Sequence, residues 1–130
     1  IARGLLTGKY APGSQPEAGT RAARQDKRMM ETEWREESLL IAQKVKARAE
    51  AAGITAGQFA TAWGLNNALV TGVIAGPRTP EQMRDYFGAP DYQFTAEDEA
   101  FVDALVPTGH PSTPGFNDPG YPLEGRVSRV

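Results

Sequence analysis

The sequence predicts an α/β fold of which this chain holds only a part. Helical patterns alternate with a short β-branched run, residues 69–75, and a tight turn and a further helix follow it. The run has no polar face, which is typical of a strand buried on both sides in a parallel sheet. A single strand cannot form a sheet, so we expect its neighbouring strands to lie outside this chain.

The first expected element is an exposed loop over residues 11–31, where proline, glycine and basic residues replace any apolar period. A helix is expected from about residue 33 to 52 because apolar residues recur at steps of three or four, and Gly53 is a typical stop. These apolar residues are Leu39, Ala42, Val45, Ala49 and Ala52.

Three further helices are expected from their start signals. Thr55 and Gln58 have the form of a capping box, and Thr79 precedes a proline at the first helical position. Thr95 begins the last helix, which runs to Val106. We expect the acidic side chains of these helices to be solvated surface. Residues 1–106 are thus expected to form the folded part, and residues 107–130 a tail.

Composition limits the possible partners. The chain has 130 residues, 40% hydrophobic and 23% charged, with a net charge of −2, which suits one soluble domain and argues against nucleic acid or an anionic membrane. With no cysteine and one histidine, a disulfide frame, a thiolate nucleophile and a histidine-rich metal site are excluded. We expect a cytoplasmic protein, and the apolar start at Ile1 suggests a fragment.

The opening stretch GLLTGKY, residues 4–10, resembles a phosphate-binding loop but lacks its pattern. A P-loop needs four residues between its glycines and a Ser or Thr after the lysine. Here three residues separate Gly4 from Gly8, and Tyr10 follows Lys9. Nucleoside triphosphate hydrolysis is therefore not expected, although the glycines and the lysine still suit an anion.

The turn Gly76-Pro77-Arg78-Thr79-Pro80-Glu81-Gln82 is the sharpest local signal. An arginine stands just before a helix whose free N–H groups and positive dipole end favour an anion, so the turn suits a phosphate. Such sites recur after the seventh and eighth strands of (β/α)₈ barrels. The spacing alone favours the other interpretation, an exposed arginine beside a well-capped helix.

Three blocks together resemble the C-terminal part of an aldo-keto reductase. They are GLLTGKY at residues 4–10, QFATAW at residues 58–63 and VIAGPRTPEQ at residues 73–82. The resemblance implies an incomplete (β/α)₈ TIM barrel, about strands seven and eight with their helices, with residues 1–9 as the end of strand seven and its loop. It also implies NADP(H) as cofactor, bound without a G-x-G-x-x-G motif, and none is present here.

The resemblance carries cofactor contacts over to two parts of the chain. In the first part, Gly4, Leu5 and Gly8 would pass under the pyrophosphate, with N–H groups from Leu5 and Gly8 and the charge of Lys9. Arg21, in the following loop, either folds over the cofactor or is a solvated charge.

In the second part, Gly76 would allow a close turn and Arg78 would pair with the 2′-phosphate and lie against the adenine. Gln82 would contact the adenosine ribose or its phosphate, or instead turn back to cap the Thr79 N–H. Where the family commonly has Asn, this chain has Tyr86, so adenine would be held by stacking or a hydroxyl contact, or not from that position.

The implied reaction is hydride transfer from NADPH to a small-molecule aldehyde or ketone. The family's Tyr, Lys, Asp and His lie in its first half, so no catalytic residue is expected here, and the chain without that N-terminal half is expected to be inactive. Two alternatives are a regulatory module that binds the cofactor without turnover, and a binder of phosphorylated ligands from another barrel family. Tyr10 and Trp63 are interpreted as packing residues and His110 as a surface residue. Trp34 either anchors the loop or reaches a substrate pocket.

Overall fold

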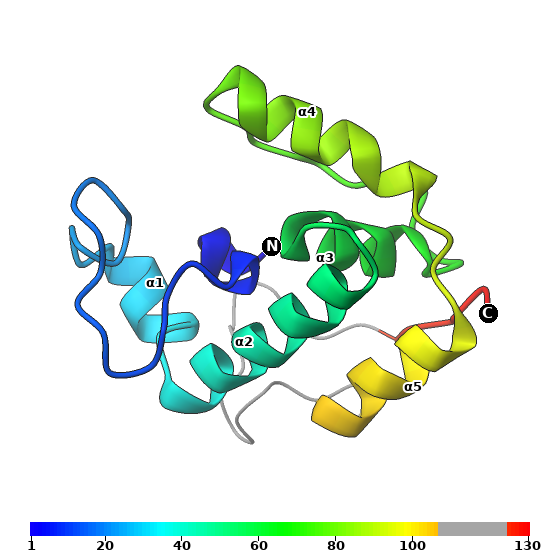
Figure 1. Ribbon diagram of the computed structural model, residues 1–130, viewed down its shortest axis with the longest axis horizontal. Helices are drawn as coiled ribbons and strands as arrows, with labels where there is room; N and C mark the ends of the chain where they lie inside the picture. The colour runs from blue at the N-terminus through cyan, green and yellow to red at the C-terminus, as the bar shows by residue number, and fades with distance from the viewer. Residues whose placement is uncertain (107–124) are drawn as a thin grey trace.

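The computed structural model describes residues 1–106 and 125–130, and helices joined by turns and irregular segments make up that part of the chain (Figure 1). Its elements in order are the 3₁₀ helix η1 (Ala2–Thr7), α1 (Lys27–Thr32), α2 (Glu36–Ala51), α3 (Ala56–Leu65), α4 (Pro80–Gly88), the 3₁₀ helix η2 (Ala89–Asp91) and α5 (Ala96–Leu105).

Helix α2 runs through the middle of the molecule and contacts two hydrophobic clusters (Figure 1). Its first half packs with η1 and α1 in the first cluster, which includes Leu5, Met29 and Leu39. Its second half packs with α3 in the second cluster, where Phe59 is 1% exposed. The apolar period read from the sequence therefore marks the buried side of α2 correctly, except at Ala52, which is exposed and lies just past the end of the helix.

The predicted helix starts are confirmed. Thr55 Oγ1 accepts from the Gln58 N–H at 3.0 Å, and Gln58 Oε1 accepts from the Thr55 N–H at 3.0 Å, which completes the capping box. The same reciprocal pair joins Thr95 and Asp98 at the start of α5. These signals act within four residues, and they are satisfied locally.

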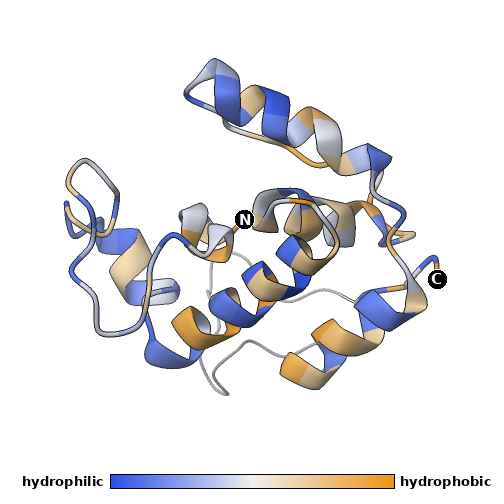
Figure 2. Cartoon of the chain, viewed as in Figure 1, coloured by the Kyte–Doolittle hydropathy of each residue, from blue (hydrophilic) through white to orange (hydrophobic). Residues whose placement is uncertain are grey.

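The buried strand predicted over residues 69–75 does not form. No strand occurs in the described part of the chain; Leu69 is 64% exposed and Ile74 is 101% exposed. Figure 2 shows that this segment and α4 carry hydrophobic residues outside the packed helices. A strand needs a neighbour to pair its N–H and C=O groups, and residues 1–106 and 125–130 provide none beside it.

Two other sequence-based expectations need correction near the N-terminus. The loop predicted over residues 11–31 contains the start of α1, because Asp26 Oδ1 caps the Met29 N–H at 3.0 Å and Met29 is fully buried. The strand end expected over residues 1–9 is instead η1, whose backbone turns left-handed at Arg3 (φ 52°) and Gly4 (φ 92°).

The acidic face of α5 is also different from the expected solvated surface. Asp98 is 0% exposed; Arg48 Nε donates to it at 2.9 Å and Tyr92 Oη at 2.7 Å. Burial alone would raise the pKa of Asp98, but hydrogen bonds from Tyr92, Arg48 and Thr95 outweigh it, so the pKa lies below its ordinary value. Asp98 therefore ties α5 to α2.

The predicted tail is only partly described. His110 lies outside the described residues, so its expected surface role stays a prediction. Residues 125–130 return to the end of α3, where Asn67 and Ser128 form an isolated antiparallel bridge. In the portion that the structure describes, no helix is long and apolar enough to cross a membrane.

Candidate cofactor site

The first part of the predicted site is the loop that follows η1. Gly8 closes η1 in the left-handed conformation, φ 69° and ψ 11°, and a Cβ there would lie 2.7 Å from Lys46 Cδ. Only glycine fits this position without moving Lys46. The Gly8 N–H donates to the Leu5 carbonyl at 3.1 Å, so in this conformation it is not free for the phosphate contact expected of it.

Lys9 is the exposed cation of this loop. Its Nζ lies 5.1 Å from the centroid of the Tyr10 ring and close to Gly4, 3.4 Å from where a Cβ on that glycine would lie. Tyr10 is 2% exposed and meets Trp34 edge-on, with ring centroids 5.3 Å apart. Burial confirms that Tyr10 is a packing residue, and it leaves Lys9 as the charged group that a ligand can reach.

Gln43, on α2, contacts this loop, and sequence reasoning did not identify it. Its Nε2 donates to the carbonyls of Gly8 at 3.0 Å and Tyr10 at 2.8 Å, so it fixes the backbone on both sides of Lys9. The available signal was a polar side chain next to Ala42 on the buried side of α2. That signal is weak, because a helix-period pattern does not say which loop the side chain contacts.

The second part of the predicted site is the turn into α4. The Arg78 side chain is exposed, and its backbone N–H donates to Gln82 Oε1 at 2.7 Å. Thr79 Oγ1 accepts from the Gln82 N–H at 3.3 Å, as expected of an N-cap. The Gln82 side chain thus turns back one residue further than a capping box requires, to Arg78 rather than Thr79.

The glycine and the tyrosine of this second part are less constrained. Gly76 has open space where a Cβ would lie and no left-handed φ, so the fold itself does not require glycine there. Tyr86 is half-buried on α4. Neither geometry contradicts a ligand contact, and neither requires one.

Helix α4 is held on α3 by one polar group and two close approaches. Thr55 Oγ1 donates to Asp85 Oδ1 at 2.8 Å, and a Cβ on Gly57 would lie 2.9 Å from Asp85 Oδ2. Three residues further along α4, a Cβ on Gly88 would lie 2.3 Å from Gln58 Nε2. No residue of α4 is buried, so these contacts at its C-terminal half are what hold it on α3.

The structure forms the two parts separately. Both η1 and α4 pack on α3, which therefore supports both. Within residues 1–106 and 125–130, no hydrogen bond or ion pair joins the Arg78 side chain to residues 4–9, and none joins the half-buried Arg21 side chain to either part. No cluster of three or more metal-ligating side chains occurs among the described residues.

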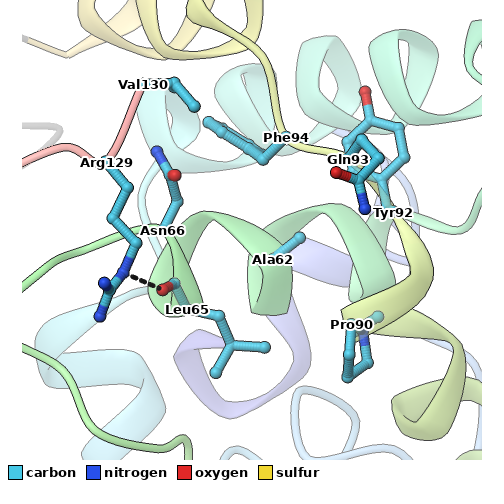
Figure 3. A pocket seen from close by; sticks show the side chains of 10 residues that line it. Ala62, Leu65, Asn66, Pro90, Tyr92, Gln93, Phe94, Arg129 and Val130 are labelled. Atoms are coloured by element: carbon cyan, nitrogen blue, oxygen red, sulfur yellow. Dashed lines mark hydrogen bonds between the residues drawn. The ribbon is translucent and has the colours of Figure 1, made fainter.

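A cavity of about 330 Å³ lies elsewhere, between α3, η2 and the C-terminal residues (Figure 3). Leu65, Phe94 and Pro90 form apolar walls, and Arg129 lies at one side with its Nε 3.3 Å from the Leu65 carbonyl. None of the predicted cofactor residues lines this cavity. It is distinct from the site that the sequence indicates.

The chain matches the Aldo/keto reductase family over residues 1–107. It belongs to this family, and the match confirms the resemblance read from the three sequence blocks. A comparison with curated proteins gives no match. The family indicates an oxidoreductase of the aldo-keto reductase kind, generally with a nicotinamide cofactor, and it implies a (β/α)₈ barrel although the described residues here form helices alone.

Proposed function

We propose that this chain supplies the phosphate-binding part of an NADP(H) site in an enzyme that reduces small aldehydes or ketones. The observation that carries the proposal is Arg78, an exposed arginine whose backbone is fixed by Gln82 at the start of α4, inside the family match. A guanidinium in this place meets the two needs of a phosphate, which are charge and directed N–H groups.

Arg78 would read the 2′-phosphate that distinguishes NADPH from NADH. Its planar guanidinium can donate two hydrogen bonds to one phosphate, and the positive dipole end of α4, which begins two residues later, favours the same negative charge. Gln82 holds the Arg78 backbone, and we assign it that positioning part in addition to an adenosine contact. Gly76 and Tyr86 would line the adenosine end, and Arg21 would close over it.

The loop over residues 4–9 would face the pyrophosphate. Lys9 supplies the charge, and Gly4 leaves room for its ammonium group. Gly8 contributes its left-handed turn, and a phosphate contact through its N–H would require the bond to the Leu5 carbonyl to open. Leu5 itself is buried at 2% exposure, so its side chain anchors the loop in the first cluster.

We further propose that residues 1–106 are the last two strand–helix units of a barrel and that residues 107–130 follow it as a tail. The support is the exposure of side chains that a soluble protein normally covers: Ile74 at 101% and Phe87 at 69%. A barrel's N-terminal half would pair residues 69–75 as a strand and would bring the catalytic residues.

The test compares Arg78→Ala with Arg84→Ala in a protein that carries this chain within a whole barrel. Arg84 is a matched control because it is an exposed arginine six residues further on, on α4 itself, paired with Glu81 at 3.6 Å. We expect Arg78→Ala to weaken NADPH binding by about 10- to 150-fold, the loss of a charge-assisted contact, and to leave NADH nearly unchanged. Equal weakening of both cofactors would contradict the assignment.

An activity assay on the same whole-barrel protein distinguishes an enzyme from a regulatory module. Oxidation of NADPH, followed by its absorbance with a simple aldehyde added, is expected to show turnover. Tight cofactor binding with negligible turnover for a panel of aldehydes and ketones would favour the regulatory alternative.

A further inference from the structure

The last six residues of the chain, 125–130, lie beyond the family match, which ends at residue 107. They nevertheless make some of the best-formed contacts of the described structure. The surface they cover consists of Trp63, Asn66 and Asn67 at the end of α3 and Glu99 on α5. We call this surface the α3–α5 groove.

Arg126 is the centre of the contact. Its Nε donates to Glu99 Oε1 at 2.6 Å and its Nη2 to Glu99 Oε2 at 2.7 Å, so the pair is bidentate. Its Nη1 donates to the Trp63 carbonyl at 3.0 Å, and its guanidinium carbon lies 4.0 Å from the centroid of the Trp63 ring. Both charged side chains are largely buried, at 10% and 12% exposure.

Backbone pairing surrounds this ion pair. The Ala68 N–H donates to the Val127 carbonyl at 2.7 Å, and the Arg129 N–H donates to the Asn66 carbonyl at 2.9 Å. Asn66 Nδ2 donates to Ser128 Oγ at 2.9 Å. The segment thus satisfies carbonyls that the end of α3 leaves free, which a non-specific tail contact would not do.

The groove also fixes where the chain leaves α3. The Asn67 side-chain oxygen accepts from the Leu69 N–H and the Val127 N–H, each at 3.1 Å, so one amide holds both the tail and the start of residues 69–75. These residues lead directly to the turn at Arg78. Loss of the tail would leave the Asn67 side-chain oxygen with one of its two hydrogen bonds.

We propose that the α3–α5 groove is a docking site for the chain's own residues 125–130, closed by Arg126, and that docking fixes the path of residues 67–70. The tail thus lies across the end of α3 and α5 and links the two helices through Arg126. It also supplies one wall of the 330 Å³ cavity through Arg129 and Val130. The proposal involves no cofactor, so it stands or falls independently of the assignment of Arg78.

The experiment measures amide hydrogen exchange by NMR in the full chain and in Arg126→Ala, Arg126→Lys and the control Arg84→Ala. In Arg126→Ala we expect exchange at Ala68, Leu69 and Arg129 to accelerate about tenfold or more, because a buried charge-assisted pair is lost. The lysine variant keeps the charge without the bidentate geometry, so its exchange should be intermediate. Arg84→Ala should leave these amides unchanged.

Unchanged exchange at Ala68 and Arg129 in Arg126→Ala would overturn the docking. Faster exchange there with unchanged Leu69 would overturn the claim that docking fixes residues 67–70. If Arg126→Ala also loses protection in α2, Glu99→Gln provides the test, since it keeps the size of the side chain and removes only its charge. Faster exchange at Ala68, Leu69 and Arg129 in Glu99→Gln supports the proposal, and unchanged exchange at these amides in Glu99→Gln overturns it.

Discussion

Phe59 and Phe87 are the same residue type in two opposite environments. Phe59, on α3, is 1% exposed and contacts the rings of Tyr92, Phe94 and Phe101. Phe87, on α4, is 69% exposed. We call the first environment the packed region, which comprises α2, α3 and α5, and the second the open segment, residues 69–88.

The difference shows which parts of this chain are complete by themselves. In the packed region each helix finds hydrophobic partners within the chain, and α3 and α5 also begin with a complete capping box. In the open segment the cap is present at Thr79, but Leu69 is mostly exposed and Ile74 fully exposed. Helix caps, which depend on neighbours in the sequence, form in both regions. Burial of apolar side chains, which depends on distant parts of the chain, is achieved only in the packed region.

The largest expected effect comes from truncating the two phenylalanines. Phe59→Ala should lower the free energy of unfolding by about 3–5 kcal/mol, because it removes buried area and leaves a cavity. Phe87→Ala should change it by less than about 0.5 kcal/mol, as for other exposed sites. Urea unfolding followed by circular dichroism measures both, and similar losses for the two variants would show that the open segment is packed in solution.

The second-largest loss of stability is expected from the buried carboxylate of Asp98. Asp98→Ala should destabilise the packed region by about 3 kcal/mol, because it leaves Arg48 and Tyr92 without their shared acceptor. Asp91→Ala is the control, an exposed acid in η2. A loss no greater than the control's would mean that Asp98 does not tie α5 to α2.

Acid should weaken the packed region through two carboxylates. Hydrogen bonds from Arg126 hold the pKa of Glu99 below its ordinary 4.5, and the pKa of Asp98 lies below 3.8. Because folding lowers both pKa values, their contribution is complete above about pH 5 and is lost as the pH falls through the lowered values. A pH series of unfolding curves should be flat from pH 7 to 5 and should fall below about pH 4.

A flat series down to pH 3 would contradict the coupling of these carboxylates to folding. The variant Asp98→Asn provides the control, since it removes the titrating group and should reduce the acid dependence. Acid dependence of the same size in that variant would assign the effect to other carboxylates.

The smallest effects come from the helix caps. Thr55→Ala should cost about 1 kcal/mol, because α3 is part of the cooperative core. Thr79→Ala removes a cap of the same type, but α4 buries no residue, so the global loss should stay below about 0.5 kcal/mol while α4 frays locally. Equal global losses would place α4 in the cooperative unit.

Sequence reasoning predicted what local chemistry decides. Thr55, Thr79 and Thr95 marked three helix starts correctly, and the apolar period marked the buried face of α2. Asp26 was overlooked as the cap of α1 within a stretch rich in turn residues. The family was predicted from the three blocks and confirmed.

What could not be predicted depends on contacts across the chain. The run at residues 69–75 has the composition of a strand, yet a strand exists only beside another. Asp98 and Glu99 resemble ordinary surface acids, and nothing local shows that Arg48 and Arg126 reach them from 50 and 27 residues away. For the candidate site, the sequence indicated the residues, and the structure added Gln43 and Asp85 as their supports.

The most direct test of the central claim is a crystal structure, with NADP⁺ bound, of a barrel that carries this chain. The account predicts the Arg78 guanidinium at hydrogen-bonding distance from the 2′-phosphate, about 2.7–3.0 Å, with Lys9 beside the pyrophosphate and residues 69–75 paired as a strand. Arg78 directed away from the cofactor, with the 2′-phosphate held by other residues, would contradict it.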